Sequence, residues 1–300
     1  MPRVIHDHSQ WPVGDQLGAG NYLTPEKRLE ALALVRHGHL FDLGHIIEYG
    51  APRFEPAQTP YLLLGAPNWQ GGIRRRRQAG ASNDAGANLE RIEMTTHVGT
   101  HIDALGHFTI GSEMFGGLDA NDVSTDFGLL KLGIEHAPSI VTRGLMVDVS
   151  GLDGGAFLEA GRSIAPDDIE KCLTASKLQI RQGDVVLINT GWGRFFMSDN
   201  ARYLSGEPGI NLAAAQWLTR QGVTAIGTDT MAVEVLPGEK HPEVQMPVHQ
   251  HCLVEAGVYL IENLLLTPLV DAKIAECCFI LLPVKFKGAT GSPARPIAMV

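Results

Sequence analysis

Cysteine is scarce in this chain of 300 residues: there are 4, and no two have the Cys-x-x-Cys spacing of structural zinc or thioredoxin-like sites. A disulfide framework is therefore excluded, and the adjacent Cys277 and Cys278 lie in an apolar run typical of a buried strand. No apolar stretch is long enough to span a bilayer, and residues 1–21 lack the apolar core of a signal peptide. We expect a cytoplasmic protein without membrane contact.

Positive charge and aromatic side chains are also in short supply. The 24 Lys and Arg residues are outnumbered by 33 Asp and Glu residues, which gives a formal net charge of -9. This balance disfavours a protein that binds the phosphate backbone of nucleic acids. Aromatic residues make up only 6%, which argues against an extended stacking surface. A hydrophobic content of 44% is nevertheless enough for a sizeable core.

The order of apolar and amphipathic segments predicts an α/β fold. Thr24 and Pro25 carry the signals of a helix start, within an N-terminal helical extension over residues 1–39. From residue 140 onward, apolar runs typical of buried strands alternate with helical patterns. The clearest of these segments are 145–149, 166–173, 185–189, 212–221 and 223–227. No composition break divides the chain, so we predict one domain over 1–300. The run Arg74 to Arg77 is interpreted as a solvated basic loop.

Histidine, in contrast, is abundant and clustered. There are 12 His residues, and His97, His101 and His107 fall with Asp103 inside eleven residues. In a strand, His101 and Asp103 would lie on one face, whereas His97 could reach them only if the chain bends. Gly99 is the residue that allows such a bend without steric cost. A lone histidine is usually satisfied by a backbone carbonyl, but this set together indicates a divalent metal site with open coordination positions.

The residues from His97 to Phe108 also carry a family likeness. The sequence His97-Val98-Gly99-Thr100-His101-Ile102-Asp103-Ala104, followed by His107-Phe108, resembles the signature of the cyclase-like metal-dependent hydrolases, the family of bacterial kynurenine formamidase and isatin hydrolase. Leu105 replaces the usual Pro, which affects a turn rather than a ligand. The likeness runs from about residue 40 to the end. It implies a cyclase-like swivelling β/β/α fold, with a mixed sheet or barrel-like core flanked by helices, in a homodimer or homotetramer.

The resemblance further implies that His97, His101 and Asp103 bind one divalent ion, Mn²⁺ or Zn²⁺, without an organic cofactor. His107 would lie beside this ion as a proton-transfer group or as a ligand to a second metal, and His107 and Glu262 are then the candidates for catalytic proton transfer.

The two-metal formamidases add a distal His and, twelve residues later, a Glu. Counting back twelve from Glu262 reaches Gln250, which would serve as an oxygen ligand to a single ion. The alternative is a register in which His249 or His251 takes that position.

These residues predict a hydrolase that attacks an amide, cyclic amide or lactone bond of a small molecule with a metal-activated water. The substrate would be an aromatic degradation product, and Trp192, Trp69, Phe196 and His249 are the candidate substrate-binding residues. Two other hypotheses remain open at this point. One is a non-haem iron oxygenase with a two-His-one-carboxylate site. The other is a non-catalytic binding protein stabilised by its metal.

Overall fold

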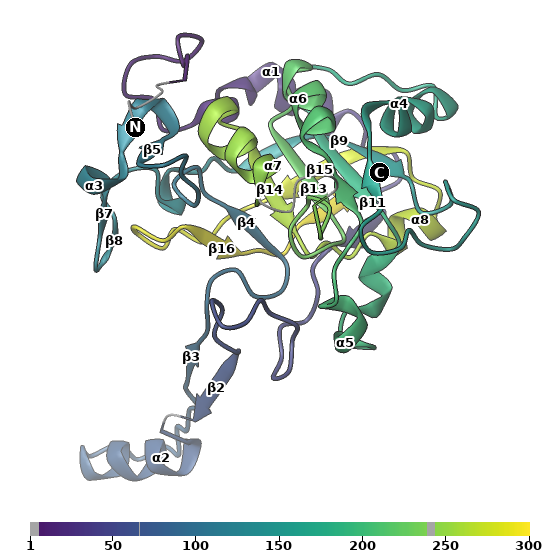
Figure 1. Ribbon diagram of the computed structural model, residues 1–300. Helices are drawn as coiled ribbons and strands as arrows, with labels where there is room; N and C mark the ends of the chain where they lie inside the picture. The colour runs from purple at the N-terminus through teal and green to yellow at the C-terminus, as the bar shows by residue number, and fades with distance from the viewer. Residues whose placement is uncertain (1–5, 66, 239–243) are drawn as a thin grey trace.

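A mixed nine-stranded sheet forms the body of the protein in the computed structural model, which describes residues 6–65, 67–238 and 244–300 (Figure 1). The strand order is β1-β17-β15-β9-β11-β13-β14-β4-β16. The four central strands β9, β11, β13 and β14 are parallel, and antiparallel strands continue the sheet on both sides. Their bounds are β1 Leu40–Asp42, β4 His101–Asp103, β9 Ile140–Asp148, β11 Val185–Asn189, β13 Ala225–Thr228, β14 Tyr259–Glu262, β15 Glu276–Leu281, β16 Gly291–Pro293 and β17 Ile297–Met299.

Helices flank this sheet, so the predicted α/β class with a mixed sheet is confirmed. The α-helices are α1 Pro25–Leu32, α2 Trp69–Gln78, α3 Ala120–Val123, α4 Pro166–Ala175, α5 Asn200–Tyr203, α6 Leu212–Arg220, α7 Pro247–His249 and α8 Thr267–Asp271. Short 3₁₀ turns cover Gly18–Tyr22, Phe115–Gly117, Ile134–His136 and Trp192–Phe195, and a π-helix over Gln250–Ala256 continues directly from α7. None of the helices among the described residues is long and apolar enough to cross a membrane.

Local sequence signals account for several of these elements. Thr24 caps α1, because its side chain accepts a hydrogen bond from the backbone N–H of Lys27 at 3.2 Å, and Pro25 occupies the first turn. Every residue of β11 is buried, as expected of a parallel strand covered on both faces. The arginine run was predicted wrongly as a loop: Arg74 to Arg77 belong to α2, which Asn68 caps.

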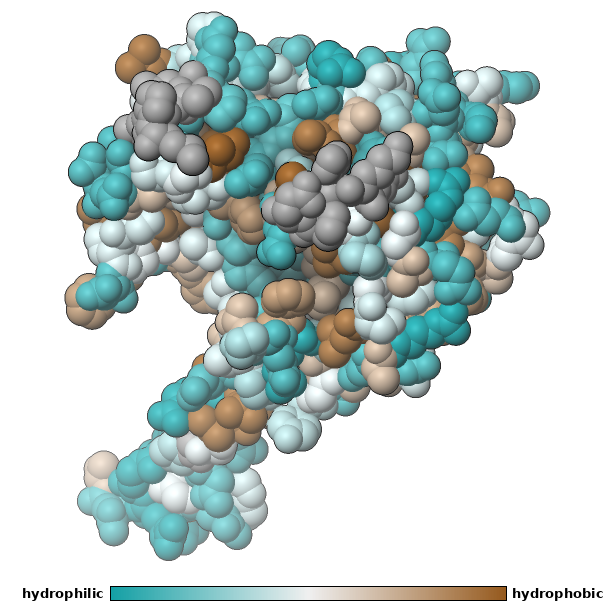
Figure 2. Space-filling view, in the orientation of Figure 1, coloured by the Kyte–Doolittle hydropathy of each residue, from teal (hydrophilic) through white to brown (hydrophobic). Residues whose placement is uncertain are grey.

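An arm projects from the body between residues 59 and 95 (Figures 1 and 2). It consists of α2 and the strand pair β2, Leu62–Gly65, and β3, Glu90–Glu93. Leu63 and Ile92 form a cross-strand pair and are 56% and 60% exposed. An isolated pair of four-residue strands buries little apolar surface and has little stability of its own. Further short pairs are β5 Glu113–Met114 with β6 Leu118–Asp119, β7 Ser124–Thr125 with β8 Gly128–Leu129, and β10 Ser163–Ile164 with β12 Gly209–Ile210.

Candidate metal centre

The pairing register of the neighbouring strands β14, β4 and β16 brings acidic and histidine side chains together. His101 and Asp103 are two residues apart on β4, so their side chains leave the same face of the sheet. On β14, Glu262 lies directly opposite His101, and on β16, Gly291 lies directly opposite Asp103. Directly opposed residues of an antiparallel pair share a face. Three ligand-type side chains therefore converge at the point where β4 joins the parallel part of the sheet.

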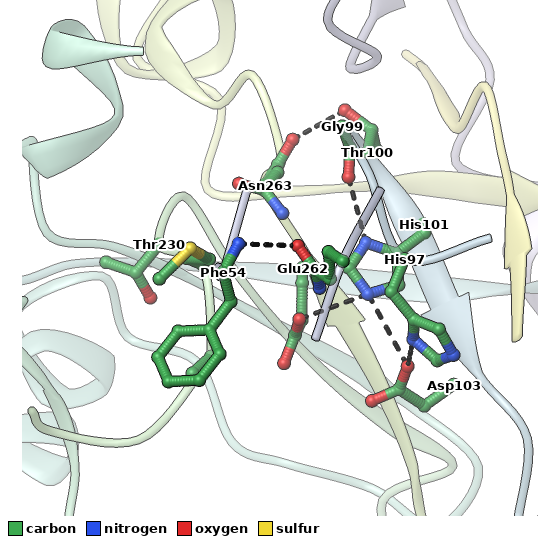
Figure 3. A network of polar contacts seen from close by, with 12 residues as sticks. Phe54, His97, Gly99, Thr100, His101, Asp103, Thr230, Glu262 and Asn263 are labelled. Carbon is green, nitrogen blue, oxygen red and sulfur yellow. Dashed lines mark hydrogen bonds and ion pairs between the residues drawn. The ribbon is translucent and has the colours of Figure 1, made fainter. Parts of the chain in front are cut away.

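The predicted bend at Gly99 is present and brings in His97. Gly99 has φ +70°, a left-handed conformation that favours glycine. His97 then turns back so that its Nδ1 is 2.8 Å from Oδ1 of Asp103. The carbonyl of Gly99 lies 2.8 Å from Nδ1 of His101, which leaves Nε2 of that ring facing the carboxylates (Figure 3). The same bend thus orients both histidines.

Glu262 and His249 close the other side of the cluster. Nε2 of His101 is 3.1 Å from Oε2 of Glu262, and Nε2 of His249 is 3.1 Å from Oε1 of the same carboxylate. His249 is also 3.7 Å from Oδ2 of Asp103. Its second ring nitrogen, Nδ1, is held at 2.6 Å by Glu234, an orientation typical of metal-binding histidines. The two oxygens of Asp103 therefore face different histidines.

The residues fit a divalent cation, because several polar atoms at the centre are buried without a partner. Nε2 of His101 and both oxygens of Asp103 have no hydrogen-bond partner among the described residues, although neighbouring donor atoms are close. Such atoms cost free energy unless something binds them. Two groups offer ligand atoms within 4.8 Å of one another, His97 with Asp103 and His107, and His101 with Asp103 and Glu262. Imidazole nitrogen and carboxylate oxygen are ligands that zinc and manganese accept.

Electrostatics divide the histidines into two kinds. Burial lowers the pKa of His101, but the contacts with Asp103 and Glu262 outweigh it and raise that pKa to about 10. Burial is likewise outweighed at His249, where Glu234 and Glu262 raise the pKa to about 10. Burial dominates at His107 and lowers its pKa to about 4. The ring of His107 stacks on His97 with centroids 4.1 Å apart, and it is neutral at neutral pH.

Gln250 does not join this cluster in the way we predicted. Its amide nitrogen donates to the backbone carbonyl of Thr109 at 3.1 Å, and His249 occupies the position beside Asp103 and Glu262. This is the alternative register of the sequence analysis. His249 precedes Glu262 by thirteen residues instead of twelve, and the intervening π-helix accommodates one more residue than a turn of α-helix. The ring of His251 also contacts a different residue, because its Nδ1 lies 2.6 Å from Oε2 of Glu255.

A cavity of about 990 Å³ opens onto the cluster, but three of the four predicted substrate-binding residues are absent from its described lining. Trp192 is 1% exposed and packs against Phe195 in a second apolar cluster. Phe196 stacks on His45 there, with centroids 4.0 Å apart. Trp69 is half exposed on the arm. Only His249 lines the cavity, together with His97, His107 and Glu262.

Sequence reasoning missed Glu234, Thr290 and Phe108. Glu234 orients His249. Oγ1 of Thr290 lies 2.9 Å from Nε2 of His97. Phe108 lines the cavity, and its ring centroid lies 4.7 Å from that of His249. Phe108 belongs to the motif and could have been proposed from it. Glu234 and Thr290 lie 15 and 193 residues from the histidines that they contact, and no spacing rule marks them.

Gly291 limits the space around His97 and supports a testable prediction. A Cβ atom added at Gly291 would lie 2.6 Å from Cε1 and 3.0 Å from Nε2 of the His97 ring. We expect Gly291→Ala to push His97 away from Asp103 and to weaken metal affinity by about 10- to 100-fold, as displaced ligands and their supports do. Metal titration by calorimetry measures this change. Gly65→Ala, where an added Cβ meets no atom within 4 Å, is the matched control, and equal affinities in both variants would contradict the prediction.

Comparisons with known proteins find relatives that match most of the chain. The family model described as putative cyclase matches residues 41–235. Cyclase-like protein 2 of Oryza sativa subsp. japonica is 26% identical over 99% of this chain and 92% of its own length. The kynurenine formamidase of Geobacillus thermodenitrificans is 26% identical over 76% of this chain and 89% of its own length.

Solved structures show the same likeness. The crystal structure of a novel cyclase is 28% identical and superposes with a TM-score of 0.85 over 99% of this chain and 98% of its own. Isatin hydrolase A from Labrenzia aggregata superposes with a TM-score of 0.65 at 21% identity, over 92% of this chain and 98% of its own. The motif at residues 97–108 lies inside the matched segment. This chain therefore belongs to the cyclase family.

Proposed function

We propose that this protein is a metal-dependent hydrolase that cleaves an amide, cyclic amide or lactone bond of a small molecule. One observation carries the proposal: Asp103 is fully buried beside a cavity of about 990 Å³, and its two oxygens face His97 at 2.8 Å and His249 at 3.7 Å without a hydrogen bond of regular geometry among the described residues. Relatives named kynurenine formamidase support the amide as the bond class.

We further propose two ion positions that share Asp103, in place of the single ion expected with Gln250. His97 and His101 approach Asp103 through Oδ1, whereas His249 approaches it through Oδ2. Glu262 contacts both His101 and His249, and is better suited to hold ions than to exchange protons. The ions would be Mn²⁺ or Zn²⁺. They would lower the pKa of a bound water molecule and polarise the carbonyl group under attack.

His107 is the proton carrier in this proposal. Its ring is neutral, lines the cavity and stacks on His97, so it can accept a proton from the attacking water. The water oxygen forms a bond to the carbonyl carbon, and the carbon–nitrogen or carbon–oxygen bond of the substrate then breaks. His107 returns the proton to the leaving nitrogen or oxygen. The products are a carboxylic acid and an amine or alcohol, which remain joined if the substrate was cyclic.

Hydrolysis by the metal-loaded protein tests this function. Protein treated with a chelator, and the same protein reloaded with Mn²⁺ or Zn²⁺, would be assayed against isatin, N-formylkynurenine, other formamides and a set of lactones. We expect turnover of at least one class, only with metal, and equally well without oxygen. Turnover that requires O₂ would contradict the proposal in favour of an oxygenase, and bound metal without turnover of any member would indicate a binding protein.

The raised pKa values predict opposite pH trends for metal binding and for the metal-free fold. In the unfolded chain a histidine has a pKa near 6.5, and in the metal-free fold His101 and His249 reach about 10. Their contribution to stability is present below pH 6.5 and is lost as pH rises from 6.5 through about 10. Over the same window protons compete less strongly with a metal ion for the two rings, so metal affinity rises by up to about tenfold per pH unit for each proton that the ion displaces.

Calorimetric metal titration and thermal unfolding between pH 6.5 and 9.5 measure both trends. We expect the unfolding temperature of metal-free protein to fall with pH while metal affinity increases. Affinity that is independent of pH across this range would contradict the assignment of both histidines to the ions.

We also propose that the chain forms a homo-oligomer through the arm, because Leu63 and Ile92 would otherwise expose an apolar pair on a marginal hairpin. The double variant Leu63→Lys with Ile92→Glu keeps a favourable cross-strand pair but removes the apolar surface. Sedimentation analysis should then show a smaller species than the unmodified protein. Val13→Glu, at a fully exposed position in the body, is the control. An unchanged sedimentation coefficient in the double variant would contradict this mode of assembly.

A further inference from the structure

The cavity beside the metal centre differs in character from the centre itself. Apart from the metal-centre residues and Glu234, its described lining carries no ionisable side chain. Lys and Arg are absent from the described residues that line it. On the side formed by β12, the start of α6 and the segments around residues 231–236 and 246, the wall is apolar. We call this side the apolar lobe, and it consists of Ile210, Leu212, Met231, Val235, Leu236 and Met246.

The polar side chains of the lining are partly engaged within the protein. Asn211 caps α6, since its Oδ1 accepts the N–H of Ala214 at 2.9 Å, and its Nδ2 donates to Ser163 at 3.0 Å. Gln58 uses Oε1 to accept the N–H of Phe54 at 2.8 Å. These engaged atoms are not available to pair with a charged ligand group, and an unpaired charge in an apolar site is costly.

One buried acid fixes the wall of the apolar lobe. Glu207 is 0% exposed and accepts the backbone N–H groups of Met231 and Ala232, both at 2.7 Å. Its own backbone pairs with Leu236 in both directions, at 2.8 and 3.0 Å. The segment 231–236 is therefore held in place before any substrate arrives. A preformed apolar wall favours binding because little ordering is needed.

We propose that the substrate is uncharged away from the bond that is cleaved, and that its non-reacting part is a bulky apolar group seated in the apolar lobe. This inference rests on the proposed hydrolase function. The cavity holds the volume of roughly 30 water molecules, so the reacting bond alone would leave most of it unfilled. The described lining holds no Lys or Arg, so a substrate carboxylate seated in the apolar lobe would lack a described cationic partner there. Glu234, the carboxylate within the segment 231–236, is already engaged by the ring and the backbone N–H of His249, so a substrate ammonium group in the apolar lobe would have to compete with these contacts.

Three substrates with the same reacting formamide test this proposal. They are N-formyl-4-pentylaniline, its analogue with a terminal carboxylate on the chain, and its analogue with a terminal ammonium group. We expect metal-loaded protein to hydrolyse the neutral compound with a kcat/KM about tenfold or more above that of either charged analogue. Equal values, or preference for a charged analogue, would overturn the substrate class. Hydrolysis of none of the three, nor of lactones, would instead reject the proposed function.

Binding gives a readout that does not depend on turnover. The amine product of the neutral compound and that of the carboxylate analogue would be titrated into Zn²⁺-loaded protein by calorimetry, where the neutral-chain amine should bind about tenfold more tightly than the amine that carries the carboxylate. The same order of affinities is expected even if the reacting bond is not an amide. Equal affinities would contradict the proposal that the apolar group of the substrate binds in the apolar lobe.

A positive charge introduced into the apolar lobe should weaken this preference for the neutral compound. Leu212 lies at the first residue of α6 and is 37% exposed, so an arginine can be accommodated there. We expect Leu212→Arg to raise kcat/KM for the carboxylate analogue by about tenfold relative to kcat/KM for the neutral compound. Leu152→Arg, at an equally exposed leucine of 36% outside the described lining, is the matched control. An unchanged ratio in Leu212→Arg, or the same shift in the control, would contradict the assignment.

Discussion

Replacing Asp103 with Asn is expected to abolish metal binding and hydrolysis together. The amide has almost the same shape, so packing is kept, but the charge that both ion positions share is lost. Asp103 is fully buried, and its two oxygens face His97 on one side and His249 on the other. A bound ion contributes several kcal/mol to the stabilisation of charge in the transition state. We therefore expect kcat/KM to fall by about a thousandfold or more.

Metal content by mass spectrometry and kcat/KM would be measured on the same preparations of the Asp103→Asn variant. Asp167→Asn is the control, since Asp167 is an exposed acid in the first turn of α4. Asp103→Asn that retained its metal and its turnover would contradict the role of Asp103 as the shared ligand.

Replacing His107 with Gln is expected to separate chemistry from metal binding. His97, His101 and Asp103 remain in place, so at least one ion per chain should stay bound. The proton acceptor is lost, which typically lowers turnover by about 100- to 10,000-fold. His107 lines the cavity and contacts the ring of His97 rather than a carboxylate within hydrogen-bond distance, which is why its loss should fall on kcat.

Steady-state kinetics together with metal analysis of the His107→Gln variant check this expectation. His136→Gln, at a histidine 39% exposed on the surface, should leave both quantities unchanged. A fall in metal content that matches the fall in kcat would make His107 a ligand only. An unchanged kcat would remove it from the mechanism.

The sequence was sufficient for those parts of the fold and site that depend on local patterns. Val185–Asn189 is apolar throughout because it is covered on both faces, and Thr24 and Pro25 mark a helix start by their own chemistry. The bend at Gly99 followed from two-residue periodicity, since His97 could not otherwise reach Asp103. These inferences need no knowledge of distant residues.

The residues that the structure places differently from our prediction depend on how distant or irregular segments pack. Gln250 was chosen by counting along the chain, and the π-helix shifts that count by one residue in favour of His249. Trp192 follows a buried strand, a frequent position for pocket residues. Gly191, at φ +76°, begins a turn after which the indole packs among Phe157 and Phe195 instead. Neither outcome is encoded in a local spacing.

Glu234 shows a different limit. Nothing in the pattern around residue 234 distinguishes it from an ordinary surface acid. It is 2% exposed, and its carboxylate lies 2.6 Å from His249. Only the fold reveals that this carboxylate fixes the ring, because the contact joins a loop of the cavity wall to the helix that follows it.

Anomalous diffraction from crystals of the protein loaded with Mn²⁺ or Zn²⁺ shows whether Asp103 holds the ions. We expect anomalous peaks beside Asp103 at coordination distances of about 2.0–2.2 Å from its carboxylate oxygens. The first peak would lie against His97 and His101, and a second against His249 and Glu262. Peaks confined to other parts of the molecule, with Asp103 still without a bound ion, would contradict this expectation.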